Sequence, residues 1–212
     1  MKTVNKVALL AMLSSLVSQP VWADEAAMQS LKGKLAQLTS FQGQFEQVVH
    51  DQEGNELQTG SGSITLAQPL KIRWQQEMPD DTLFVSSGET TYYYDTFAEQ
   101  VTVLDTTKLI DTTPFVLLTT QESGQWSKYN VELDRHQYLI TPKNKVDSQV
   151  EQLTLSFDAN NEGLAKLTVN DISGQVSTFS FKQSKVNVPV KDSMFEFVIP
   201  EGVVVDDQRG SD

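Results

Sequence analysis

From Phe41 onward, apolar and polar residues alternate in short segments, and this pattern limits the chain to a mainly β fold. In the segment 41–49, Phe41, Phe45 and Val49 share one side of an extended strand, while glutamine and glutamate fill much of the other. A period of two is typical of strands with one buried face. Similar segments recur between turn residues, and we expect about ten or eleven mostly antiparallel strands. The candidate segments are 41–49, 57–66, 70–75, 83–86, 91–94, 100–104, 128–133, 137–141, 150–157, 164–170, 175–182 and 195–199.

Two helices are expected to accompany these strands. Met28, Leu31 and Leu35 recur at three- and four-residue steps, which predicts an N-terminal helix. The dipeptide Thr-Pro at 113–114 has the residue types of a helix start. The residues that follow, 115–118, are apolar nearly all round. This short helix is either a plug in the core or a lid over a cavity.

The elements together predict a single strongly curved antiparallel sheet with both helices packed on its concave side. Gly60 and Gly62 interrupt the second predicted strand and are expected to mark a bend or a bulge, which curved sheets need. The sequence shows no internal repeat, low-complexity segment or interdomain linker. We therefore expect one domain.

The first 23 residues have the organisation of a secretory signal peptide. Two lysines precede an apolar run, 7–17, that is too short to span a bilayer. Val-Trp-Ala at 21–23 supplies the small outer residues of a cleavage site. We expect cleavage after Ala23, which leaves residues 24–212 as a soluble, exported protein. Loss of the two lysines takes the formal net charge from −12 to −14.

The sequence offers little for catalysis, for metal binding or for nucleic acids. It contains no cysteine, so we expect no disulfide, no metal–thiolate site and no lipid anchor on the chain itself. Its two histidines, His50 and His136, lie outside any metal-ligand spacing, and there is no nucleophile elbow or phosphate-binding glycine loop. The acidic excess argues against nucleic acid. We expect a binding protein without cofactor or metal, and not an enzyme.

Five segments stand in the same order, and at similar separations, as motifs of a known family. They are residues 38–41 (Leu-Thr-Ser-Phe) leading to 45–47 (Phe-Glu-Gln), residues 69–74 from Pro69 to Arg73-Trp74, residues 84–88 with Tyr92, Tyr94 and Asp95, residues 113–118 (Thr-Pro-Phe-Val-Leu-Leu), and residues 202–209 (Gly-Val-Val-Val-Asp-Asp-Gln-Arg). Together, behind a signal peptide, they resemble the periplasmic outer-membrane lipoprotein carriers of the LolA family. The resemblance covers essentially the whole chain.

The resemblance implies an incomplete, half-open β-barrel whose mouth is closed by helices. It implies a monomeric periplasmic carrier that binds the acyl chains of lipoproteins. An ABC transporter in the inner membrane would release the lipoproteins, and a receptor on the outer membrane would accept them. The cavity and lid residues expected on this basis are Phe45, Ile72, Trp74, Leu83, Val85, Tyr92, Tyr94, Phe115, Leu117 and Leu118.

One position departs from the family pattern. Members usually place an arginine directly before the proline, where it bonds the lid and holds the empty cavity shut, but here that position is Gln68. A glutamine amide donates without charge assistance, so its bond should be weaker by about 1 kcal/mol. We expect the lid gate to involve Gln68 or Arg73.

Two other classes of protein fit parts of the same pattern. A lipocalin-like binder of small free lipids would also have many strands around an apolar hollow. A small outer-membrane barrel would also combine a signal peptide with many strands, but its strands should carry an apolar outward face. Segments 41–49 and 175–182 present glutamine, glutamate, lysine and serine instead, which favours the carrier.

Overall fold

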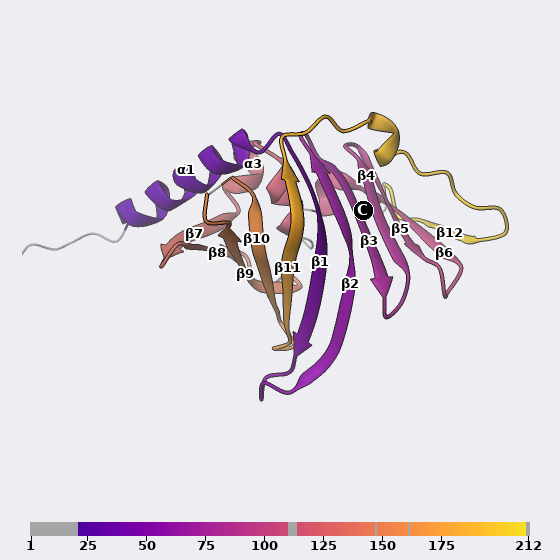
Figure 1. The fold of residues 1–212 in the computed structure, drawn as a ribbon, viewed down its shortest axis with the longest axis horizontal. Coiled ribbons are helices and arrows are strands. Elements are labelled where there is room, and N and C mark those ends of the chain that lie inside the picture. The colour runs from indigo at the N-terminus through magenta and orange to yellow at the C-terminus, as the bar shows by residue number, and fades with distance from the viewer. Residues whose placement is uncertain (1–20, 110–113, 147, 161, 211–212) are drawn as a thin grey trace, which may run out of the picture.

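Twelve strands form one continuous sheet that curves around a group of helices in the computed structural model (Figure 1). The structure describes residues 21–109, 114–146, 148–160 and 162–210, without the side chains of 21–23, 114 and 115. The predicted signal peptide therefore lies largely outside the described residues. The strands are β1 (Ser40–His50), β2 (Glu56–Ala67), β3 (Lys71–Met78), β4 (Thr82–Ser87), β5 (Thr90–Asp95), β6 (Gln100–Asp105), β7 (Tyr129–Asp134), β8 (Gln137–Pro142), β9 (Val150–Phe157), β10 (Leu164–Asp171), β11 (Val176–Val186) and β12 (Val204–Asp207).

The strand order is β12-β6-β5-β4-β3-β2-β1-β11-β10-β9-β8-β7. Every neighbouring pair is antiparallel except β12 with β6, which is parallel. The pairing of β1 with β11 joins the two halves of the chain in one sheet. β12 and β7 are not paired with each other, so the sheet remains an open half-barrel, as the sequence predicted.

The C-terminal end of the chain differs from the prediction. The segment 195–199 was predicted as a strand, and this was wrong: residues 192–195 form the 3₁₀ helix η2 (Asp192–Phe195), followed by irregular chain. The last strand is instead β12, which was not predicted and raises the number of strands to twelve. Its four residues pair with β6, about a hundred positions earlier, so no local pattern reveals it.

The two predicted helices are present. α1 (Val21–Gln37) places Leu31 and Leu35 fully inside the protein, and the 3₁₀ helix η1 (Pro114–Thr119) occupies the position expected for the short apolar helix. Two single-turn helices flank η1, namely α2 (Thr106–Leu109) and α3 (Ser123–Trp126). No helix in the described ranges combines the length and the hydropathy needed to cross a membrane.

The two faces of the sheet are defined by its register. Leu66 lies opposite Phe41 on one side and Ile72 on the other, so these three side chains share a face. We call this the inner face, because α1 and η1 cover it. Arg73 lies opposite Thr65 and Val85 on the other face, which we call the outer face.

In the C-terminal segment, residues 187–210, η2 and Phe197 pack on the outer face of β3 to β5, and β12 extends the sheet beside β6 (Figure 1). Phe195 of η2 is only 2% exposed, and the ring of Phe197 packs on Tyr92 and Tyr94 at centroid distances of 5.3 and 5.8 Å. The Lys71 ammonium also forms an ion pair with Asp192 at 2.7 Å. This half of the sheet therefore has apolar contacts on both faces.

Gly62 is the position where two strands approach too closely for a side chain. The register of β2 and β3 shifts between Ser61 and Gly62, which confirms the predicted irregularity. A Cβ at position 62 would overlap the carbonyl oxygen of Gln75 and lie 2.7 Å from Cζ of Phe45. We expect Gly62→Ala to lower the free energy of unfolding by about 1–3 kcal/mol, because the backbone must shift. Urea-induced unfolding measures this change.

Gly33→Ala is the matched control. Gly33 lies on an exposed part of α1, and a Cβ there would have no neighbour within 4 Å. Alanine should stabilise the helix by about 0.5–1 kcal/mol. Equal stability of the two variants would contradict the close approach at Gly62.

Candidate functional site

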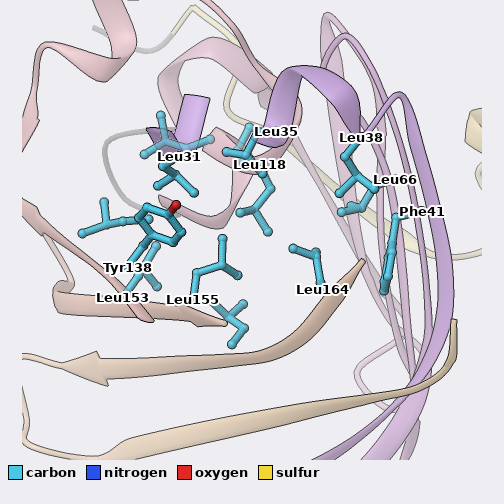
Figure 2. Close-up of a cluster of buried hydrophobic side chains, with 14 of the residues drawn as sticks. Leu31, Leu35, Leu38, Phe41, Leu66, Leu118, Tyr138, Leu153, Leu155 and Leu164 are labelled. Carbon is cyan, nitrogen blue, oxygen red and sulfur yellow. The ribbon is translucent and has the colours of Figure 1, made fainter. Parts of the chain in front are cut away.

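The inner face of the sheet and its helices meet in one continuous apolar cluster (Figure 2). Leu31 and Leu35 enter it from α1, Leu118 enters from η1, and Tyr138 and Leu155 rise from β8 and β9. All five are at most 3% exposed. The curved sheet thus surrounds a space that the helix side chains fill.

Five predicted site residues lie in or against this cluster. Phe45, Ile72, Leu117 and Leu118 are buried members of it, and Trp74 packs against its margin in a partly buried position. The chain brings these residues together from β1, β3 and η1. Phe115 was also predicted here, but its side chain lies outside the described residues.

Four predicted site residues lie on the outer face instead. Val85 is opposite Arg73 and Tyr92, and Leu83 is opposite Tyr94, so all four predicted side chains point away from the inner cluster. They are covered by the C-terminal segment rather than by the helices. The apolar residues of β4 and β5 occupy both faces because both faces are covered. The sequence pattern alone does not say which face packs against the helices and which against the C-terminal segment.

Aromatic rings line the inner face beside the helices. The ring centroids of Phe45 and Trp74 lie 4.7 Å apart, and Phe179 lies 4.9 Å from Trp74. Trp74 and Phe179 remain partly exposed, so this aromatic surface borders the helix-covered space. Tyr93 shares the face through its pairing with Phe84, and burial, followed by the charge of Asp95, raises the pKa of its hydroxyl.

The sequence prediction missed the contribution of the second half of the chain to the inner face. The alternation in 137–141 and 150–157 contained the necessary signal, but it does not identify the partner of each strand. The helix residues were recognised as apolar without being assigned to the site. The members missed include Leu31, Leu35, Tyr138, Ile140, Leu153, Leu155, Leu164, Leu167, Phe179 and Phe181.

Gln68 holds the end of α1. Its amide nitrogen donates to the carbonyl oxygen of Leu35 at 2.5 Å and to that of Leu38 at 3.0 Å. Leu35 lies in the last turn of α1 and Leu38 directly follows the helix, and the Leu35 carbonyl also accepts from the Leu38 N–H at 3.1 Å. The amide thus bonds the helix end without charge assistance, on α1 rather than on η1.

The peptide groups of Leu70 connect the same turn to the other helices. The Leu70 N–H donates to the carbonyl of Thr119 at the end of η1 at 3.0 Å, and its carbonyl accepts from Ser86 Oγ at 2.6 Å. The Ser86 hydroxyl is hydrogen-bonded to the hydroxyl of Thr106 in α2 at 3.2 Å. The Thr106 hydroxyl is in turn hydrogen-bonded to that of Thr91 at 2.8 Å. The three hydroxyl residues are fully buried. The turn formed by residues 68–70 is therefore bonded directly to the end of α1 and to η1, and to α2 through Ser86.

Arg73 lies away from these helices. Its guanidinium is on the outer face, where it donates to the carbonyl of Met194 at 3.4 Å and to Gln75 at 3.5 Å. It contacts the C-terminal segment and not the helices of the inner face. Of the two predicted gate residues, only Gln68 lies at the helix-covered side.

Comparison with known proteins accounts for this arrangement. The family described as "Outer membrane lipoprotein carrier protein LolA" matches residues 36–198, a range that runs from the end of α1 through η2. The chain belongs to the LolA family. The outer-membrane lipoprotein carrier protein of Pseudoalteromonas translucida (strain TAC 125) is 52% identical over 212 residues, with 100% of both chains covered.

One further relative and one solved structure are also similar to this LolA-family chain. The outer-membrane lipoprotein carrier protein of Aeromonas salmonicida (strain A449) is 34% identical over 205 residues, covering 97% of this chain and 100% of that protein. An uncharacterized conserved protein from Thermus thermophilus has a TM-score of 0.52 at 10% identity, covering 85% of this chain and 98% of that one. The latter likeness concerns the fold alone.

The bonds of Gln68 predict how firmly α1 is held. Gln68→Ala removes both donors to the helix end and should lower the stability of the docked helix by about 1 kcal/mol, whereas Gln68→Arg should raise it through charge-assisted bonds. Hydrogen exchange of the α1 amides should be faster in the first variant and slower in the second. Gln58→Ala, the same change at an exposed position of strand β2, is the control and should leave the exchange unchanged.

Proposed function

We propose that this LolA-family protein is a soluble periplasmic carrier that shelters the acyl chains of lipoproteins in water. The observation that supports this proposal is the inner apolar cluster, which is built from a curved open sheet on one side and from helices on the other. The helices contact the turn 68–70 through a small number of hydrogen bonds. Acyl chains would bind on the inner face once the helices move away.

The size of the hydrophobic gain explains why the helices matter. Burial of one acyl chain of about 15 methylenes is worth about 12 kcal/mol, and three chains about 35 kcal/mol. This exceeds the practical limit of about 20 kcal/mol for non-covalent binding, and release would become too slow. Loading must first displace Leu117 and Leu118 from the cluster, so the net affinity falls. Transfer to a receptor then needs no energy source at that step.

We further propose the route of the cargo. An inner-membrane ABC transporter would supply the lipoprotein, and a lipoprotein receptor on the outer membrane would accept it, while the carrier acts as a monomer and catalyses no reaction. Incubation of the purified protein with inner-membrane vesicles and ATP tests this route. We expect ATP-dependent appearance of acylated lipoprotein in the soluble fraction, bound to the carrier. Binding of free fatty acids or sterols alone would favour the lipocalin-like alternative.

Export makes a separate prediction. We expect the mature protein to begin at Asp24, because the small residues of 21–23 form the cleavage site. Intact-mass measurement of the protein from the periplasmic fraction checks this boundary. A mass that still includes residues 1–23 would contradict the proposed signal peptide.

Charged substitutions within the inner cluster test the binding site. Leu118→Glu and Ile72→Glu place a carboxylate among side chains that are at most 2% exposed, where an unpaired charge opposes the burial of hydrocarbon. We expect at least a tenfold loss of lipoprotein uptake from vesicles. The control is Leu57→Glu, the same change at a side chain that is 53% exposed on β2.

Protein stability must be measured beside uptake. Circular dichroism identifies the variants that remain folded, and a photo-crosslinking residue at position 118 or 57 reports contact with cargo without an added charge. Normal delivery by a folded Leu118→Glu protein, or crosslinking from position 57 alone, would overturn the assignment of the inner face.

A further inference from the structure

β12 is a terminal strand of the sheet, and within the part of the chain that the structure describes its second edge pairs with no other strand (Figure 1). The Val204 N–H donates to the Glu99 carbonyl at 2.9 Å, and the Gln208 N–H donates to a carbonyl within β6 at the same distance. In a parallel pair, every second residue bonds the partner strand with both its N–H and its C=O. The even-numbered residues of β12 therefore bond β6, and the backbone groups of Val205 and Asp207 point away from it.

Both faces of β12 are accessible to solvent. Val204 is 63% exposed and Val205 is 48% exposed. Consecutive side chains of a strand point to opposite faces, so the exposure of both valines means that neither face of β12 is buried under another segment. An edge with outward backbone groups and two open faces is a template for an added strand.

Further apolar side chains are exposed beside this strand. Phe97 is 88% exposed in the turn between β5 and β6, and Glu99 of the same turn accepts the backbone bond from Val204. Val198, in the chain that leads into β12, is 87% exposed. A group of exposed apolar side chains near one edge of a sheet is typical of a surface that a partner covers.

The charges of this part of the chain are negative. Residues 196–208 contain no lysine or arginine, and their carboxylates are those of Glu196, Glu201, Asp206 and Asp207. The guanidinium of Arg209, which follows, is paired with the Asp207 carboxylate at 2.6 Å. A negative surface of this kind attracts a partner that carries basic side chains and repels an anionic lipid surface.

We propose that the free edge of β12 pairs with an extended segment of a partner protein. Apolar side chains of that segment lie beside Val204 and Val205, and lysine or arginine side chains lie beside Asp206 and Asp207. Among the described residues, none of β5, β6 or β12 belongs to the inner cluster. The partner therefore docks without displacing the helices of the inner face, and the pairing does not depend on the binding of acyl chains.

A synthetic peptide tests the pairing without altering the protein. The probe is a capped peptide of about six residues, the usual strand length, with valines in one half and lysines in the other, made in both sequence orders. The N–H and C=O groups of Val205 and Asp207 offer four bonds, which predict a Kd of about 1 mM, measured from the NMR shifts of the β12 amides. The same peptide methylated at every backbone nitrogen loses two of these bonds and should bind about 25-fold more weakly. Equal binding of the two peptides, or no binding of either, would overturn the proposal.

A pair of protein variants tests the same edge from the other side. Val205→Pro removes an outward N–H and no bond to β6, and proline is tolerated on edge strands. Val205→Ala keeps the N–H and is the matched control for the lost side chain. We expect the proline variant to bind the unmethylated peptide about fivefold more weakly than the alanine variant. Hydrogen exchange of the β6 amides shows whether β12 stays paired, and if it does not, the two peptides on the wild-type protein decide.

The choice of a basic partner is tested against other occupants of the edge. A peptide with glutamates in place of the lysines should bind about tenfold more weakly, because it meets like charges. Self-association of the wild-type protein in sedimentation, lost in Val205→Pro, would assign the edge to a second copy and overturn the proposal. Binding to phosphatidylethanolamine–phosphatidylglycerol vesicles that Val205→Pro does not change, without binding of the peptide, would overturn it in favour of a lipid surface.

Discussion

The contact between the inner face of the sheet and the helices α1 and η1 is the interaction on which the rest of the structure depends. A sheet that does not close into a barrel leaves its concave face to be covered by something else. Here Leu31 and Leu35 from one helix and Leu118 from another supply the cover. These side chains come from two helices that are separate from the paired strands of the sheet.

The two halves of the sheet are supported differently. In the half formed by β3 to β6, β3 contacts η1 and β6 contacts α2, while Phe195 and Phe197 of the C-terminal segment pack on the outer side. The outer faces of β1 and β11 instead present polar side chains, such as Glu46 and Lys182, which form an ion pair. Strands β3 to β6, which have residues packed on both faces, lie beside the turn 68–70, and this turn is bonded to the helices.

Small polar contacts decide how firmly the cover is held. The amide of Gln68 bonds the end of α1, and the peptide groups of Leu70 reach η1 directly and α2 through Ser86. Net hydrogen-bond energies of about 1 kcal/mol each are small beside the gain from burying an acyl chain. In the proposed function, these bonds would hold the helices over the apolar cluster and would be outweighed by the burial of an acyl chain.

Much of this architecture followed from the sequence alone. Alternation placed eleven of the twelve strands, the spacing of Met28, Leu31 and Leu35 placed α1, and the apolar run 115–118 placed η1. These features are local, because the period of side chains along a strand or helix depends on the backbone geometry of that element. The parallel strand β12 was missed because its pairing with β6 is distant in the sequence.

Only the tertiary structure decided which apolar face became the inner one. Trp74 and Tyr92 are both aromatic residues of predicted strands, yet the first borders the helix-covered cluster and the second packs against Phe197. The alternation of side chains along a strand shows that the strand has two faces. Which face becomes the inner one depends on the distant segment that covers it. The same reason explains why the sequence named Gln68 as a gate residue, while the fold alone showed that its partners are the carbonyls of Leu35, in α1, and of Leu38, just after it.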